Sequence, residues 1–119
     1  MPLAPIELVA RLSAIMPDFA GRCASPDNLF RNDDGSFSLC GVFAECSHYV
    51  REQFPQLPTE QRRSLVAFIE QCMAEPGSEL DTAVATCFLE NLVGKSFSPE
   101  WEAMLGSRAS KFVREWSGA

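Results

Sequence analysis

The sequence predicts an all-α fold, an irregular bundle of five or six helices that forms one domain over residues 1–119. Apolar residues recur at helical spacing in several segments, and prolines, serines and threonines stand where those segments begin or end. No run alternates apolar and polar residues for long enough to build a sheet. The short connections favour partly stacked antiparallel pairs, and a long irregular loop should follow the first helix.

The first helix should begin at Pro5, a favoured residue of a first helical turn, and end at about Met16, before Pro17. Its apolar residues have the spacing of one buried face: Leu8, Leu12, Ile15 and Met16.

Residues 18–38 form the expected irregular loop. Asp34-Gly35, flanked by Phe30 and Phe37, predicts a tight turn or a short hairpin. A segment of this length is either a connector held by its aromatic residues or a functional loop, and the sequence leaves both open.

A second helix is expected over residues 39–54. Its apolar residues gather on one side: Leu39, Val42, Phe43, Cys46, Tyr49, Val50 and Phe54. The opposite side carries Glu45, His48 and Glu52, which we expect to be exposed.

The third and fourth helices follow a proline at Pro58. Thr59 should cap the third, which runs to about Ala74. Ser78 opens the fourth in a sequence typical of a capping box, and Gly94 closes it. Apolar residues cover about two thirds of the fourth helix, so it should be the central element. Only a narrow stripe of it is polar: Glu79, Thr82, Thr86 and Glu90.

Two short helices should complete the bundle. Ser98 and the proline after it open one, and Ser107 opens the other after a break at Gly106. They carry the two tryptophans, Trp101 and Trp116. Core packing is the default for these rings, and an aromatic anchor at an interface is the alternative.

Charge narrows the class of partner. The net charge is −6. Residues 64–107 hold seven acids and one base, so the whole excess lies there. Nucleic-acid binding is disfavoured, because it needs a basic face. The acidic segment is either a solvated surface or a docking surface for a basic partner.

Five cysteines and one histidine leave no structural zinc site, because no C-x-x-C pair occurs. Four cysteines fall on apolar helix faces, where reduced thiols behave as small hydrophobes, and this indicates the cytoplasm. We expect no signal peptide, no membrane span and no cofactor.

Catalytic patterns are weak. Glu45 and His48 share a helix face as Glu-x-x-His, but the di-metal sites built on this motif need it twice. We therefore do not expect an enzyme, and His48 is either idle or a contact for a partner.

Asn91 lies within the apolar arc of the fourth helix, where an unpartnered buried amide costs about 1–3 kcal/mol. It should bond loop backbone from residues 18–38, or else line a crevice that binds a ligand.

Two stretches, residues 39–45 (LCGVFAE) and 83–92 (AVATCFLENL), resemble a group of small helical bacterial proteins. The resemblance spans roughly residues 29–116, and some members of the group look like immunity proteins of polymorphic toxin systems. It implies a cytoplasmic antidote that binds a secreted toxin domain and blocks its active site. The acidic charge of this chain suits that role when the toxin is a basic nuclease or a similar enzyme.

The sequence thus predicts a protein-binding module. The expected partner-binding residues are Asp33, Asp34, Glu45, His48, Glu52, Glu79 and Glu90. The alternatives are a regulatory or scaffold module with an apolar patch near the tryptophans, and a small helical enzyme or ligand carrier with a pocket near Asn91. The oligomeric state is left open.

Overall fold

The computed structural model describes residues 4–24, 38–92 and 98–116, and within them the chain is helical with no strand. The predicted all-α fold is therefore confirmed. The elements are α1 (Pro5–Ile15), α2 (Phe19–Ala24), α3 (Leu39–Gln53), the 3-10 turn η1 (Phe54–Gln56), α4 (Thr59–Cys72), α5 (Glu79–Val84), the π-helical turn η2 (Ala85–Leu89), α6 (Glu90–Leu92), α7 (Ser98–Met104) and α8 (Ser107–Trp116).

The helix starts follow the local chemistry of the sequence. The Ser38 hydroxyl accepts the N–H of Gly41 at 2.9 Å, and the Ser78 hydroxyl accepts the N–H of Asp81 at 3.1 Å. Each bond satisfies one of the amide groups that a first helical turn leaves without a partner. The capping-box prediction at Ser78 is half right, because the Asp81 carboxylate accepts from Gly77 and not from Ser78.

The α1–α3 connection contains a helix that the sequence did not predict. The expectation of an irregular segment over residues 18–38 is wrong for α2, whose Phe19 is fully buried and meets Tyr49 edge-on at 5.7 Å between ring centres. Burial of this one ring stabilises a helix of six residues that has little tendency to form alone. Residues 25–37, with Asp33, Asp34 and the Asp-Gly turn, lie outside the described residues.

The elements α5, η2 and α6 form one continuous helix over residues 79–92. It packs on several sides, as predicted: it contacts α3, α4 and α8 and buries Val84, Phe88, Leu89 and Leu92, but it shares the central position with α3. Its middle is a π-helical turn, a feature found mostly as a single turn within an α-helix. In this turn the Thr86 hydroxyl donates to the carbonyl of Thr82.

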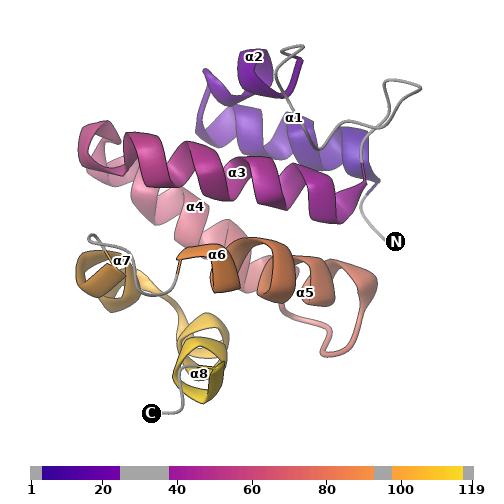
Figure 1. Ribbon diagram of the computed structural model, residues 1–119, viewed down its shortest axis with the longest axis vertical. Helices are drawn as coiled ribbons and strands as arrows, with labels where there is room; N and C mark the ends of the chain where they lie inside the picture. The colour runs from indigo at the N-terminus through magenta and orange to yellow at the C-terminus, as the bar shows by residue number, and fades with distance from the viewer. Residues whose placement is uncertain (1–3, 25–37, 93–97, 117–119) are drawn as a thin grey trace.

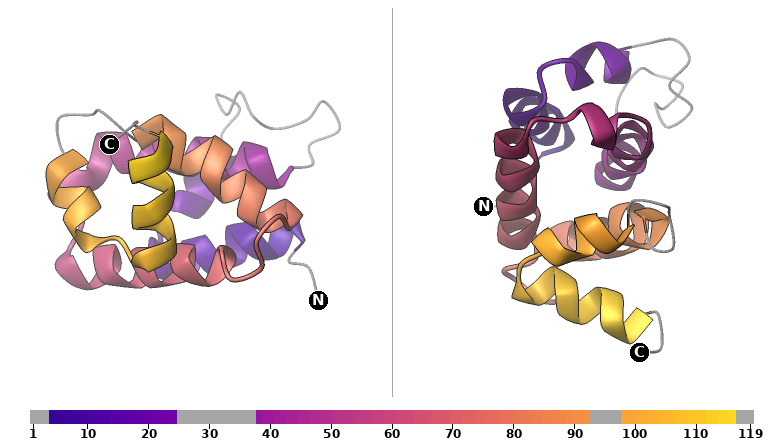
Figure 2. Two further views of the ribbon diagram at one scale, coloured as in Figure 1. Left: turned by 90° about the horizontal axis from the view of Figure 1, so that it is seen from below. Right: turned by 90° about the vertical axis from the view of Figure 1, so that its left-hand side faces the viewer.

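The helices are arranged in layers around α3. Figure 1 shows α1 and α2 on one side of α3, residues 79–92 on the other side, and α7 and α8 beyond them. α4 runs behind, and the side view in Figure 2 shows it forming a separate wall of the bundle. α3 and residues 79–92 run in the same direction, whereas α4 runs against them. The prediction of antiparallel pairs therefore holds for α4 with α1 and α5, but the central pair is parallel.

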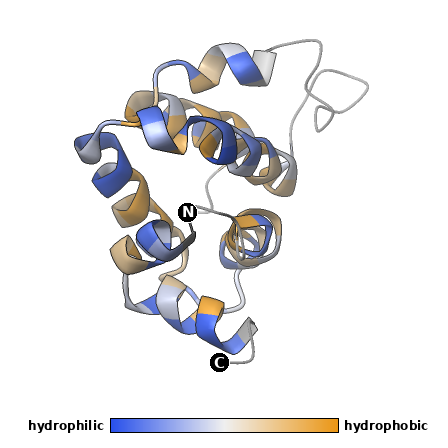
Figure 3. Cartoon of the chain, turned by 60° about the vertical axis from the view of Figure 1, so that its left-hand side comes forward, coloured by the Kyte–Doolittle hydropathy of each residue, from blue (hydrophilic) through white to orange (hydrophobic). Residues whose placement is uncertain are grey.

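The core follows the predicted apolar faces, and Figure 3 shows hydrophobic and hydrophilic residues on different sides of the helices. Trp101 belongs to this core. It is 1% exposed and contacts Phe88 and Phe54, with ring centres 5.8 and 6.1 Å away. Edge-on ring pairs at this spacing add to the stabilisation that comes from burial. Core packing is thus the correct reading of Trp101.

A carboxylate on α4 caps the start of α8. Glu70 accepts the backbone N–H of Arg108 at 2.9 Å and that of Ala109 at 3.3 Å. Gly106 makes the approach possible, since a Cβ atom there would lie 2.6 Å from the Glu70 carboxylate. A negative charge is favourable at a helix N-terminus, so Glu70 joins the C-terminal helix to α4.

Candidate functional site

The partner-binding residues predicted on α3 are engaged within the fold. Glu45 was expected to be exposed, but it is buried, because α2 covers this side of α3. The Arg22 Nε donates to Glu45 at 2.5 Å, and the same guanidinium pairs with Glu52. Hydrogen bonding to Glu52 raises the pKa of Arg22, and Arg22 in turn lowers the pKa of Glu52. The three charges therefore form an ionic cluster that fastens α2 to α3.

His48 lies beside this cluster and is partly buried. Arg51 donates to its Nδ1 at 2.5 Å. Burial lowers the pKa of His48, and the positive charge of Arg51 lowers it further. His48 is thus less exposed than expected, and it accepts a hydrogen bond from Arg51.

Glu79 and Glu90, predicted on the central helix, remain at the surface. Glu79 is exposed and Glu90 is half-buried, and the residues between them on the stripe, Thr82 and Thr86, are exposed. Among the described residues, neither carboxylate forms an ion pair. The predicted polar stripe is therefore present at the surface of the described residues.

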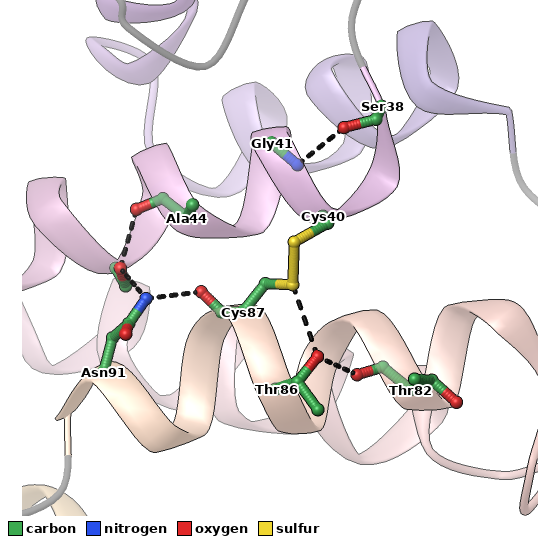
Figure 4. Close-up of a disulfide and its surroundings, with 9 residues drawn as sticks. Ser38, Cys40, Gly41, Ala44, Thr82, Thr86, Cys87 and Asn91 are labelled. Atoms are coloured by element: carbon green, nitrogen blue, oxygen red, sulfur yellow. Dashed lines mark hydrogen bonds between the residues drawn. A yellow bond between two sulfur atoms is a disulfide. The ribbon is translucent and has the colours of Figure 1, made fainter.

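Asn91 has two partners that the sequence did not indicate. Its amide nitrogen donates to the Cys87 carbonyl at 2.8 Å and to the Ser47 hydroxyl at 3.2 Å. Ser47 is fully buried and donates to the Ala44 carbonyl at 2.6 Å (Figure 4). Within the described residues Asn91 thus ties α6 to the middle of α3, and residues 25–37, from which a loop partner was expected, lie outside them.

A disulfide joins Cys40 at the exposed start of α3 to Cys87 in the π-helical turn (Figure 4). The two residues are 47 positions apart in sequence, and their Cα atoms are 5.3 Å apart. The expectation of reduced thiols is wrong for this pair. The pair was not predictable, since five cysteines allow many pairings and spacing alone does not choose among them. Cys46 and Cys72 stay as buried thiols.

A groove of about 630 Å³ lies where the starts of α1, α3 and α5 meet the end of α4. Its floor is apolar and includes Leu39, Phe68, Cys72 and Leu80. Its rim is charged, with Arg11 on α1 and with Glu75 and Glu79 at the α4–α5 turn.

The groove holds no reactive thiol, although Cys72 lines it. Burial raises the pKa of Cys72 to about 12, so this thiol is protonated at neutral pH. A thiolate is the form that attacks electrophiles and binds metals, and therefore the groove is suited to binding rather than to cysteine chemistry.

A second, shallower groove of about 490 Å³ lies between α1 and α4. Arg11 and Phe68 line both grooves, and the Arg11 guanidinium lies 5.3 Å from the centre of the Phe68 ring. The two grooves therefore have this pair in common. Neither groove includes Asn91.

Two further observations concern the described residues alone. No three His, Cys, Asp or Glu side chains there come close enough together to hold a metal ion. None of the helices in residues 4–24, 38–92 and 98–116 has both the length and the apolar character that a membrane span requires.

Glu75 was missed as a surface residue of interest. The sequence signal was its place in the acidic segment, directly before Pro76-Gly77, where a turn exposes a side chain.

Comparison with protein-family models, with curated proteins and with solved structures finds no match for this chain.

Proposed function

We propose that the chain is a protein-binding module that acts as an immunity protein, binding a basic toxin domain and blocking its active site. One observation supports this most. Five carboxylates within residues 75–102 form no ion pair with any described residue, although each is at least partly exposed: Glu75, Glu79, Asp81, Glu90 and Glu102. Unpaired negative charge of this kind speeds the capture of a basic partner and discriminates against acidic ones.

The acids divide into two groups with different roles. Glu45 and Glu52 pair with Arg22, Glu100 pairs with Arg62 at 2.6 Å, and Glu70 caps α8. These four carboxylates stabilise the fold. Nine described carboxylates form no ion pair with a described residue; five lie in residues 75–102, and the other four are Glu7, Asp18, Glu60 and Glu115. The proposal takes the five in residues 75–102 as the interface, because no described basic residue lies in that segment.

The scaffold alternative has lost its main support. It needed an exposed apolar patch around the tryptophans, but Trp101 is buried, and the side chain of Trp116 lies outside the described residues. Ile6 is the one large hydrophobic residue exposed in the described part of the chain, and single residues of this kind are ordinary.

The carrier alternative needed a pocket at Asn91, which neither groove reaches.

A cytoplasmic location stays part of the proposal, but the reduced-thiol argument for it no longer applies. The Cys40–Cys87 disulfide is a type of bond that persists in oxidising compartments.

We expect Glu79→Gln with Glu90→Gln to slow association with the partner by about tenfold at low salt, because the two changes remove part of the attraction between charged surfaces. The partner is first isolated by affinity capture on the wild-type chain and identified by mass spectrometry. Association and dissociation rates are then measured at low and high salt. The difference between variant and wild type should shrink at high salt, where exposed charges are screened.

The matched control is Glu60→Gln with Glu115→Gln, which removes two exposed acids from outside the acidic segment. It should leave association nearly unchanged. The free energy of unfolding of both double variants should lie within about 0.5 kcal/mol of the wild-type value, since surface substitutions of this kind seldom change it more. Equal association rates for the two double variants would refute the acidic interface, and a captured protein without toxic activity would refute the immunity role.

A further inference from the structure

We propose that the 630 Å³ groove receives one segment of the protein partner, in which a basic residue stands next to a large apolar residue. The apolar side chain packs on the groove floor, and the basic side chain pairs with Glu75 and Glu79. This inference rests on the proposed function, because it names the part of the surface at which the partner docks.

The groove has the dimensions and lining of a binding site. Its volume falls within the range of roughly 300–1,000 Å³ that is common for pockets that enclose a ligand. Leu39, Phe68 and Cys72 are buried and belong to the core, and the partly buried Leu80 packs against that core from α5. An apolar group that covers this floor removes its remaining exposed apolar surface from water, and this lowers the free energy of the complex.

The position of the groove is fixed by the fold. Figure 1 shows the starts of α1, α3 and α5 on the right-hand side of the bundle. The Ser38 and Ser78 caps hold two of these helix starts, and both serines also line the groove. The site is therefore formed before the partner arrives, which reduces the entropy lost on binding.

The charged side chains on the rim of the groove favour one kind of occupant and one orientation of it. Glu75 and Glu79 are exposed, and neither forms an ion pair with a described residue. At the α1 side, Arg11 lies over the Phe68 ring and repels a second cation. A basic residue is thus accepted at the α4–α5 turn and rejected at the α1 end, so the bound segment has one favoured direction.

A small cation or a metal ion is a poorer occupant. Glu75 and Glu79 belong to no group of three possible ligands among the described residues. Neither acid explains the apolar floor, which a hydrated ion leaves uncovered. A peptide segment with one basic and one apolar side chain uses both parts of the groove.

The test uses the full chain, labelled with ¹⁵N, and two synthetic tetrapeptides, acetyl-Ala-Lys-Leu-Ala-amide and acetyl-Ala-Glu-Leu-Ala-amide. The lysine peptide should shift the amide signals of Gln71, Glu75 and Leu80 at millimolar concentration, and the glutamate peptide should bind at least about fivefold more weakly. Glu75→Gln with Glu79→Gln should reduce the preference for lysine, because each exposed ion pair contributes little alone but two set the selectivity.

A steric variant separates the two grooves. Ala74 is exposed and lines the proposed groove, whereas Ala67 is exposed and lines the second one. Ala74→Tyr should weaken binding of the lysine peptide about tenfold, and Ala67→Tyr should not. The overall spectrum reports whether each variant keeps the fold.

Several outcomes would overturn the inference. Equal binding of the two peptides would remove the charge argument, and absence of shifts at the groove would remove the site. Shifts that depend on protein concentration without peptide would assign the groove to a second copy of the chain. Shifts that arise only after deletion of residues 1–3 would assign it to the chain itself. If the captured partner binds Ala74→Tyr normally but Glu79→Gln with Glu90→Gln poorly, the proposed function stands and the groove is not its docking site.

Discussion

Removal of the Cys40–Cys87 disulfide should lower the free energy of unfolding by about 4 kcal/mol. The bond closes a loop of 47 residues, and a loop of that length restricts the unfolded chain by about this amount in the chain-entropy model. A small domain has a total stability of about 5–15 kcal/mol, so the bond supplies a large share of it. The variant is Cys40→Ser with Cys87→Ala, which keeps a polar group at the exposed position and an apolar one at the buried position.

The measurement is urea unfolding followed by circular dichroism, with and without a reducing agent. Wild type should lose stability on reduction, and the double variant should not respond to the reductant. This comparison separates the disulfide from the two buried thiols, Cys46 and Cys72, which are present in both chains. Superposition of the oxidised and reduced wild-type curves would contradict the prediction.

The result also bears on where the protein acts. Cytosolic reductants keep thiols reduced, so a cytoplasmic antidote has to remain folded without the bond. A reduced chain that is still folded at body temperature is compatible with the proposed location. A reduced chain that unfolds favours an oxidising compartment, and the toxin would then be met outside the cytoplasm.

Much of the fold could be predicted from the sequence, because its helices carry both an apolar period and recognisable ends. The start of α3 at Leu39 and that of residues 79–92 follow the serine caps before them. The prediction of Thr59 as a cap is wrong by one residue, since Pro58 holds that position. α2 was missed because it is short and its stability comes from the burial of Phe19, a tertiary effect that the local pattern does not contain.

The candidate site was harder to predict. A helical wheel placed Glu45 opposite the apolar face of α3, which is correct for the helix alone. The wheel contains no information about α2, and it is Arg22 on α2 that makes burial of Glu45 possible. Glu79 is exposed as the wheel indicates, and its role in binding a partner stays a prediction. The groove itself is formed by four helix ends that are distant in sequence, and no local pattern identifies such a junction.

Replacement of Trp101 by alanine should lower the free energy of unfolding by about 3–5 kcal/mol, the usual cost of deleting a large aromatic side chain from a core. The ring is 1% exposed and lies edge-on to both Phe54 and Phe88. Its removal leaves a cavity at the junction of α7, the central helix and the turn after α3.

Urea unfolding followed by circular dichroism measures this loss without relying on tryptophan fluorescence. Trp101→Phe is the control, because it keeps an aromatic ring in the same space. Its loss in free energy of unfolding should be less than half of the loss in Trp101→Ala. The same pair of variants tests the assignment of Trp101 to the core. Substitution of a core residue lowers the free energy of unfolding of the chain. Substitution of an interface anchor lowers the affinity for the partner and leaves the stability unchanged. A stable Trp101→Ala chain that no longer binds its partner would therefore move the interface from the acidic surface to α7.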